Sequence, residues 1–367
     1  MSRRPIAYPS VIIASILQIA MTGNSLARTD SPNLEQSSML FEETVGASNP
    51  DPAREVIAKG RFTSLYEPSG IVPLPDGRFL VVEDESARAL RLISGSDGNP
   101  LTGFDVESSV AMPEKMQERW KLAMLDDLEG AAHDRSHRLY VVSSHDDQLP
   151  YWVSRRQKLL RFSIRDGRIA DVSVKLTLRR DLLASYPRLA DAVRPNRKTK
   201  ESGLSVEALA YDRRREVLLI GLRSPLVNDK AIIVRLLNPD AYLGEGVEPE
   251  FEPDLWTLDL DKGGLRAMAY DDRSDQLLLV SRREHRGNAA FKLWRLPADR
   301  TGKVRRIQVG KKDDLFDRVE GLTPFERPGA SDSGVLFVRD NGKNRSRRGA
   351  DWFIISRSTL GIDAGAP

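Results

Sequence analysis

Five segments of the chain repeat one pattern of apolar and polar residues. Each has a short apolar run, a turn rich in Asp, Arg, Pro or Gly, and a second run of Val, Leu, Ile and Tyr, which together predict a β-hairpin. The hairpins span residues 68–84, 128–146, 206–224, 265–283 and 319–341. In each of them the first strand opens on a polar residue where the pattern otherwise calls for an apolar one.

Further apolar runs after each hairpin predict the remaining strands of a repeating unit. A third strand is expected at residues 89–93, 158–164, 231–237, 291–296 and 351–356, and a fourth at residues 101–106, 172–178, 255–260 and 304–309. The last unit has no fourth strand, whereas residues 56–65 form a strand with no hairpin of their own. Four strands per unit and a period of tens of residues predict an all-β fold, a five-bladed β-propeller closed by this N-terminal strand.

Two connections between blades are long enough to hold helices. Residues 109–127 fit a short amphipathic helix, and residues 179–193 fit one helix or two, followed by a basic loop. Because such connectors cross the face where the first strands begin, both insertions are expected on one face. The alternative is a sixth, degenerate blade concealed in residues 179–205.

The N-terminal region predicts export. Residues 1–27 combine Arg3 and Arg4 with a short apolar stretch and a small-residue cleavage site, as a bacterial signal peptide does, with a membrane anchor as the alternative. Residues 28–55 predict a flexible leader and residues 56–367 a single propeller domain, periplasmic or secreted. No later run is long enough for a membrane span. With no cysteine, the chain forms no disulfides.

Hairpin geometry predicts where polar side chains gather. The starts of the five first strands meet at one mouth of the central channel, and the end of each second strand lies beside the start of its first. The residues at the strand starts are Ser69, Glu129, Glu207, Arg266 and Glu320. The residues just outside them include Asp84, His145, Asp146, Arg223, Arg282, Arg283, Asp340 and Asn341.

Three converging glutamates repel one another unless positive charge compensates them. In one interpretation, Glu129, Glu207 and Glu320 hold a hard cation such as Ca²⁺ through oxygen ligands. In the other, they pair with Arg223, Arg266 and Arg282 as polar plugs of the channel. The sequence leaves both interpretations open.

Two further features bear on the ligand. The second insertion carries seven basic residues between Arg179 and Lys200, which favours an anionic ligand if the insertion covers the mouth. His145 and Asp146 are the candidate proton-transfer residues. A net charge of +3, which falls to +1 without the signal peptide, argues against a nucleic acid partner. No nucleophile elbow, phosphate-binding loop or dinucleotide motif is present.

The repeated elements resemble an uncharacterised family of exported bacterial propellers. More distantly, Asp127-Leu128-Glu129-Gly130 and Val319-Glu320-Gly321 are similar to the repeated element of esterase-like phytase propellers. Arg266 departs from that element, and Ser69 replaces its acid in the first blade. The resemblance implies a propeller and permits phosphoester hydrolysis, without transferring any catalytic residue.

Two functions therefore compete at the mouth. The first is a binding module that captures a small anionic ligand or an envelope protein, with Ser69, Asp84, Arg223, Arg266, Arg282, Asp340 and Asn341 as ligand contacts. The second is a calcium-dependent phosphoesterase, with the metal on Glu129, Glu207 and Glu320 and a proton transferred by His145 or Asp146.

Overall fold

The computed structural model describes residues 56–84, 89–110, 125–146, 156–193, 203–283, 289–310, 313–326, 333–342 and 348–363. Residues 49–367 belong to one compact unit. The predicted signal peptide, the leader and residues 111–124, which hold most of the first insertion, lie outside the described residues. Within the described ranges, no helix combines the length and the apolar character that crossing a membrane requires.

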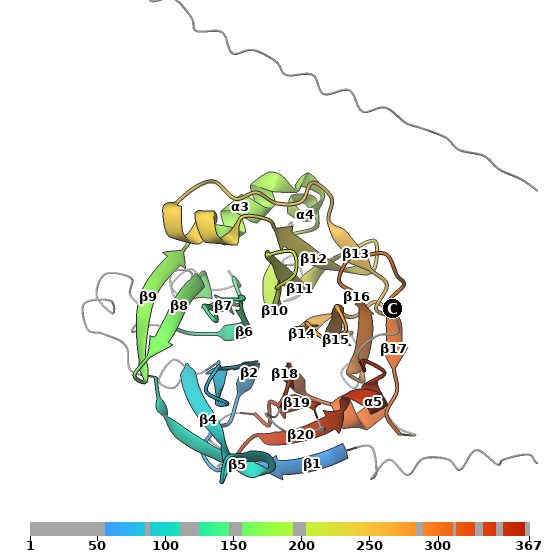
Figure 1. The fold of residues 1–367 in the computed structure, drawn as a ribbon. Helices are drawn as coiled ribbons and strands as arrows, with labels where there is room; N and C mark the ends of the chain where they lie inside the picture. The colour runs from blue at the N-terminus through green and yellow to red at the C-terminus, as the bar shows by residue number, and fades with distance from the viewer. Residues whose placement is uncertain are drawn as a thin grey trace, which may run out of the picture. The chain divides into compact units, whose positions relative to one another are not determined.

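The described strands form five four-stranded antiparallel sheets, which confirms the predicted five-bladed propeller (Figure 1). Blade 1 contains β2 (Pro68–Pro73), β3 (Phe79–Glu83), β4 (Leu90–Ser96) and β5 (Asn99–Ser109). Blade 2 contains β6 (Leu128–His133), β7 (Leu139–Ser143), β8 (Leu159–Arg165) and β9 (Arg168–Lys175). Blade 3 contains β10 (Ser205–Asp212), β11 (Val217–Val227), β12 (Lys230–Leu236) and β13 (Trp256–Leu258). Blade 4 contains β14 (Gly264–Asp271), β15 (Gln276–Arg282), β16 (Lys292–Pro297) and β17 (Arg305–Ile307).

Blade 5 joins the two ends of the propeller. It contains β18 (Val319–Phe325), β19 (Gly334–Arg339), β20 (Asp351–Ser356) and the N-terminal strand β1 (Val56–Arg61). Strand β1 pairs antiparallel with β20, with Arg61 opposite Asp351 and Lys59 opposite Phe353. The predicted closure is therefore confirmed, and it holds the ring together by hydrogen bonds between distant parts of the chain.

Neighbouring blades pack face to face through alternating residues of their strands. In β3, Leu80 and Val82 pack with Leu139 and Val141 of blade 2. The intervening Phe79 and Val81 pack instead with Leu336 and Val338 of blade 5. Because both faces of the second strand are buried in this way, its sequence is a continuous apolar run instead of an alternation of apolar and polar residues.

The inner strands β2, β6, β10, β14 and β18 approach each other closely around the centre of Figure 1. A Cβ atom on Gly130 would lie 2.9 Å from the backbone nitrogen of Leu209 in blade 3. A Cβ atom on Gly70 would likewise lie 2.9 Å from the backbone nitrogen of Ala131 in blade 2. The small residue after each polar strand start is thus dictated by contact between the backbones of neighbouring blades.

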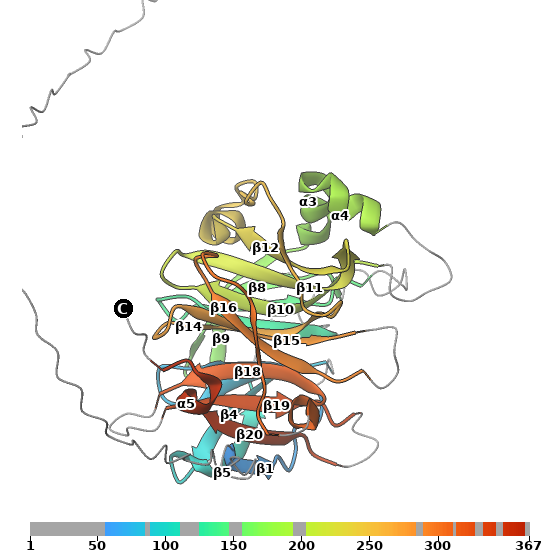
Figure 2. The same cartoon turned by 90° about the vertical axis from the view of Figure 1, so that its right-hand side faces the viewer.

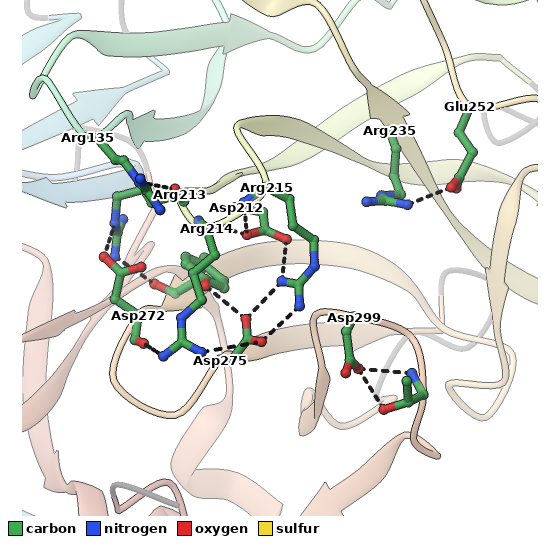
Figure 3. A network of polar contacts seen from close by, with 12 residues as sticks. Arg135, Asp212, Arg213, Arg214, Arg215, Arg235, Glu252, Asp272, Asp275 and Asp299 are labelled. Atoms are coloured by element: carbon green, nitrogen blue, oxygen red, sulfur yellow. Dashed lines mark hydrogen bonds and ion pairs between the residues drawn. The ribbon is translucent and has the colours of Figure 1, made fainter. Parts of the chain in front are cut away.

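The turns of the hairpins lie at the end of the blades opposite the polar starts of the inner strands. There, arginines of blade 3 form ion pairs with aspartates of blade 4 (Figure 3). Arg215 binds Asp275 through two hydrogen bonds of 2.9 Å, and Arg213 Nε donates to Asp272 at 2.5 Å. Blade 5 is tied to the same turn of blade 4 by the buried bidentate pair of Arg357 and Asp271, at 2.7 and 2.5 Å. The charges on this face therefore connect blades to one another.

The second insertion forms two helices, as predicted: α3 (Leu178–Ser185) and α4 (Pro187–Ala192). Leu182 and Leu189 pack with residues of blades 2 and 3, including Val142 and Leu222. In Figure 1 both helices lie at the rim, beyond β12. Arg179 touches blade 2 there, donating to the carbonyl of His145 at 3.1 Å.

Four of the seven basic residues of the second insertion, Arg194, Arg197, Lys198 and Lys200, lie outside the described residues. Three short helical turns complete the described elements: η4 (Ala241–Glu245), η5 (Asp313–Phe316) and α5 (Arg357–Leu360). In the side view of Figure 2, α3 and α4 stand away from α5.

We expect Gly130→Ala to lower the free energy of unfolding by about 2–4 kcal/mol, because the added methyl meets the backbone of Leu209 and the neighbouring strand must shift. Gly77→Ala is the contrasting variant, since Gly77 has open space around it and only a positive φ of 85°. It should cost about 1 kcal/mol. Urea unfolding measures both. Equal losses would contradict the close approach of the inner strands.

Candidate functional site at the channel mouth

Every inner strand has a β-bulge at its polar start. Residues before and after that position pair with consecutive residues of the second strand, so the polar residue is the extra one. In blade 2, for example, Leu128 is opposite Ser143 and Gly130 is opposite Val142. The bulged residues of the five blades are Ser69, Glu129, Glu207, Arg266 and Glu320. A bulge redirects a side chain out of the regular alternation, which explains how a polar residue fits an otherwise apolar strand.

The register also places the ends of the second strands at this mouth, as the hairpins predicted. Glu83 lies opposite Pro68, and Arg339 lies opposite Val319. In blade 3 the second strand also has a bulge, because the consecutive residues Ser205 and Val206 pair with Ser224 and Leu222. Arg223 is therefore a second extra residue in blade 3, beside Glu207.

Arginines link three blades at the mouth. Arg223 Nη1 donates to Glu207 Oε1 at 2.5 Å within blade 3. Arg266 Nη1, from blade 4, donates to Glu207 Oε2 at 2.8 Å and lies 3.5 Å from Glu320 Oε1 of blade 5. The Arg266 and Glu207 side chains are 8% and 3% exposed, whereas the Arg223 side chain is 34% exposed. Arg266 is thus a buried connector, and Arg223 faces solvent.

Local packing fixes these guanidinium groups in place. Arg266 and Arg282 both lie over the ring of the buried Phe291, at 5.8 and 5.1 Å from its centroid. Such cation–π contacts hold the planar groups in a defined orientation. The backbone of Arg223 is held from the other side, because a Cβ atom on Gly264 would lie only 1.9 Å from the Arg223 carbonyl oxygen.

Acidic groups gather on the blade 1 and blade 2 side. The backbone nitrogen of Asp127 donates to the carbonyl of Asp84 at 3.1 Å, and the two carboxyl groups are joined by a hydrogen bond. Asp127 also accepts a hydrogen bond from Ser144 Oγ and lies 3.2 Å from Arg156 Nη1. A carboxyl pair joined in this way shares a proton, because two adjacent carboxylates repel each other.

The carboxyl group of Glu129 interacts electrostatically with carboxylates of other blades. Desolvation by the surrounding protein raises the pKa of Glu129 well above its usual value of 4.5. The carboxylates Glu207, Asp127, Asp84 and Glu320 add to this increase. Blades 2 and 5 are not neighbours in the ring, so the effect of Glu320 on Glu129 is exerted across the channel.

Two further carboxyl groups have raised pKa values. Desolvation raises the pKa of Glu320 to about 8, since the opposing effect of Arg266 is smaller and Glu207 and Asp340 act in the same direction as desolvation. Desolvation, followed by the charge of Asp127, raises the pKa of Asp84 to about 7. These carboxyl groups therefore exchange protons near neutral pH.

The mouth is consequently divided by charge. Blades 3 and 4 contribute the guanidinium groups of Arg223, Arg266 and Arg282 around the one carboxylate of Glu207. Blades 1, 2 and 5 contribute mainly carboxyl groups, those of Asp84, Asp127, Glu129, Glu320 and Asp340, with Arg156 beside Asp127. One half of the mouth thus favours anions, and the other half favours protons, cations or hydrogen-bond donors.

Other predicted residues have more local contacts. The Ser69 hydroxyl donates to the carbonyl of Glu67 at 3.4 Å. Asn341 Nδ2 donates to the carbonyl of Gly349 at 2.9 Å, bracing a loop. Asp340 accepts from the backbone nitrogen of Gly342 at 2.6 Å and contributes to the raised pKa of Glu320. The backbone nitrogen of Asp146 donates to Ser144 Oγ at 3.2 Å.

His145 lies deeper than the sequence indicated. It is fully buried, and its Nδ1 lies 2.6 Å from the carbonyl oxygen of Ser143. Burial lowers its pKa to about 4, so the ring is neutral at pH 7. The positive charges of Arg179 and Lys158 add to this decrease. Its role in proton transfer stays a prediction, whereas Asp84 and Glu320 have pKa values near neutrality.

Sequence reasoning did not single out Asp127, Ser144 and Arg156 as members of the site. The available signal was the position of Asp127, two residues before Glu129 at the end of a connector. Asp127 has a left-handed backbone, with a φ of 60°, which aspartate tolerates better than most residues. That conformation directs the connector from blade 1 into β6.

The geometry of the three predicted metal ligands suits a guanidinium group better than calcium. Both carboxylate oxygens of Glu207 are engaged by arginines, and Glu320 shares Arg266 with it. Across the described ranges, no three His, Cys, Asp or Glu side chains form a group that holds a metal ion. Calcium at Glu129, Glu207 and Glu320 remains a prediction.

Comparisons with known proteins agree with the propeller class defined by the fold and its mouth. A sequence profile of the phytase-like family, described as "Esterase-like activity of phytase", matches residues 64–342. The chain belongs to this phytase-like family. A comparison with curated proteins found no match.

Solved structures resemble the chain at low identity. The tail fibre of Staphylococcus aureus phage P68 has a TM-score of 0.40 and 13% identity, over 84% of this chain and 55% of the fibre chain. The chain thus spans about half the length of that protein. A PQQ-bound aldose sugar dehydrogenase from Streptomyces coelicolor has a TM-score of 0.39 and 14% identity, over 82% and 96% of the two chains.

We expect Asp84→Asn to remove a pH-dependent destabilisation. The pKa of Asp84 is about 7 in the folded state, above its ordinary 3.8, so the folded state binds the proton more tightly. Protonated Asp84 therefore contributes fully to the free energy of unfolding below about pH 4, and this contribution is lost as the pH rises through about 7. At pH 8 the variant should be about 1–2 kcal/mol more stable than the wild type, and at pH 4 nearly equal to it.

Thermal unfolding between pH 4 and pH 9 measures this difference. Asp105→Asn, at an exposed position of β5 in the same blade, is the control and should change stability little at any pH. A stability difference between Asp84→Asn and the wild type that does not vary with pH would contradict the shared proton.

Proposed function

We propose that the chain binds a small anionic ligand at the channel mouth, and that a phosphorylated polyol is the ligand class that fits best. The observation that carries this proposal is the division of the mouth into a guanidinium half and a carboxyl half. Phosphoryl oxygens accept charge-assisted hydrogen bonds from arginine. Hydroxyl groups of the same ligand donate to carboxylates across the channel.

Arg223 is the proposed primary anion contact. The Arg223 side chain is 34% exposed, whereas that of Arg266 is 8% exposed. The carboxylate that Arg223 contacts, Glu207, is also neutralised by Arg266. A phosphoryl group that binds Arg223 therefore competes with Glu207, and Glu207 keeps Arg266 as a partner when Arg223 turns to the ligand. Arg282, fixed over Phe291, is a second candidate contact on the same half.

A second candidate function is phosphoester hydrolysis. The family's description names esterase-like activity of phytase, and the Asp84–Asp127 pair supplies the observation that favours it here. A carboxyl group with a pKa of about 7 donates or accepts a proton readily at neutral pH. In this proposal Asp84 transfers the proton to or from a water or leaving oxygen, while Arg223 and Arg282 hold the phosphoryl group.

Export from the cytoplasm is part of the proposal and rests on residues 1–27. We expect the mature chain to begin at Arg28 and to be recovered from the periplasm or the medium. N-terminal sequencing of the fractionated protein measures this. An uncleaved N-terminus in the cytoplasm would contradict it, and an envelope protein partner is then also ruled out.

We expect Arg223→Ala to weaken binding of inositol hexakisphosphate at least about tenfold, because one charge-assisted contact is lost while Glu207 keeps its bond to Arg266. Arg305→Ala, on the exposed outer strand β17, is the matched control that removes the same charge away from the mouth. Isothermal titration calorimetry at fixed salt measures both. Equal weakening by the two variants would contradict binding at the mouth.

If the chain hydrolyses phosphoesters, Asp84→Asn and Asp127→Asn should each lower the rate of phosphate release roughly 10²-fold or more. The measurement is phosphate release from p-nitrophenyl phosphate and from inositol hexakisphosphate, with calcium, magnesium or chelator present. Glu216→Ala, at an exposed turn on the opposite face, is the control. Absence of phosphate release from the wild type under all these conditions would leave ligand binding as the function and contradict the enzyme.

A further inference from the structure

The bulge position of blade 4 carries a cation where three other blades carry a glutamate. Arg266 is the extra residue between Leu265, opposite Ser281, and Ala267, opposite Val280. Glu207 and Glu320 occupy the corresponding bulges of the two flanking blades. The guanidinium group therefore enters the ring at the same level as the carboxylates that it contacts.

The contacts of Arg266 have the character of a bridging cation. One nitrogen, Nη1, lies 2.8 Å from Glu207 Oε2 and 3.5 Å from Glu320 Oε1. The group is buried at 8% exposure and lies over the ring of Phe291, which prevents it from turning out to solvent easily. Two carboxylates from blades that are not neighbours in the ring are thus joined through one positive charge.

We propose that the Arg266 guanidinium is a built-in cation, which fills the place between Glu207 and Glu320 that a divalent metal ion would otherwise occupy. Buried like charges require compensation, and either a metal or a paired guanidinium provides it. A guanidinium is always charged and binds carboxylates in a fixed geometry. This side of the mouth therefore assembles without a metal, and Arg266 is a positioning residue for both glutamates.

The proposal is independent of which ligand the mouth binds, since it concerns how the ring is held before any ligand arrives. It concerns only Glu207 and Glu320, so that calcium binding at Asp84, Asp127 or Glu129 is compatible with it. A test must therefore detect a change in the number of bound cations, and not merely the presence of calcium on the protein.

The experiment is titration of the chelator-treated chain with CaCl₂ alone, by isothermal titration calorimetry. In Arg266→Ala, Glu207 and Glu320 lose their shared cation, and the calcium stoichiometry should rise by one site relative to the wild type. That site should disappear in the double variant Arg266→Ala/Glu320→Gln. Arg266→Lys keeps the charge and should bind calcium as the wild type does, which separates the charge from packing effects.

Thermal unfolding supplies the second readout. Arg266→Ala should lose several degrees in chelator, roughly 5 °C or more, and recover at least half of this loss in millimolar calcium. The rise in melting temperature on adding calcium should be larger in Arg266→Ala than in the wild type. A stoichiometry that is the same in the wild type and in Arg266→Ala would overturn the proposal.

A further arm applies if Arg266→Ala does not fold. Glu320→Gln in the wild-type background should leave the calcium stoichiometry unchanged, because Arg266 and not a metal is the partner of Glu320. Loss of one calcium site in Glu320→Gln would show that a metal occupies this place and would overturn the proposal without the arginine variant. Arg305→Ala serves as the charge-matched control and should behave as the wild type.

Discussion

Repulsion between carboxylates at the channel mouth is the interaction on which this structure most depends. Five inner strands converge so closely that glycine is required at Gly70, Gly130 and Gly321, and a bulge just before each of these positions directs a side chain into the shared space. The residues at these positions in blades 2, 3, 4 and 5 are ionisable, and their charges interact across the ring.

The chain meets this repulsion in two different ways. On one side, Arg223 and Arg266 neutralise Glu207 through short contacts of 2.5 and 2.8 Å. On the other side, Asp84 and Asp127 share a hydrogen bond, and the raised pKa values of Asp84, Glu129 and Glu320 keep some carboxyl groups protonated near neutral pH. A divided mouth of this kind recognises a ligand that carries both anionic groups and hydrogen-bond donors.

The fold followed from the sequence because each hairpin is encoded locally. The apolar runs of β3, β7, β11, β15 and β19 are buried on both faces and could be recognised without knowing their partners. The lone strand β1 also indicated closure, since it had no hairpin of its own. The position of the second insertion did not follow from the sequence in the same way. Its helices α3 and α4 lie at the rim because Leu182 and Leu189 pack against blades 2 and 3, which the pattern within that segment does not reveal.

The site was predicted at the level of position but not of chemistry. Hairpin register brought Glu129, Glu207, Arg266 and Glu320 to one level, yet only the three-dimensional arrangement distinguishes a metal cage from the pairing of Glu207 and Glu320 through Arg266. The depth of His145 and the partnership of Asp84 with Asp127 depend on loop conformations that connect different blades. Such contacts leave no periodic signal in the sequence.

The most direct measurement of the central claim is a double-mutant cycle between Glu129 and Glu320, which belong to blades that are not neighbours. Unfolding free energies at pH 9 are compared for Glu129→Gln, Glu320→Gln and the double variant. If the two carboxyl groups repel each other across the mouth, removing either one relieves the same repulsion. The increase in unfolding free energy of the double variant should then be smaller than the sum of the two single-variant increases by about 0.5 kcal/mol or more. Strict additivity would contradict the convergence of the bulged side chains on one site.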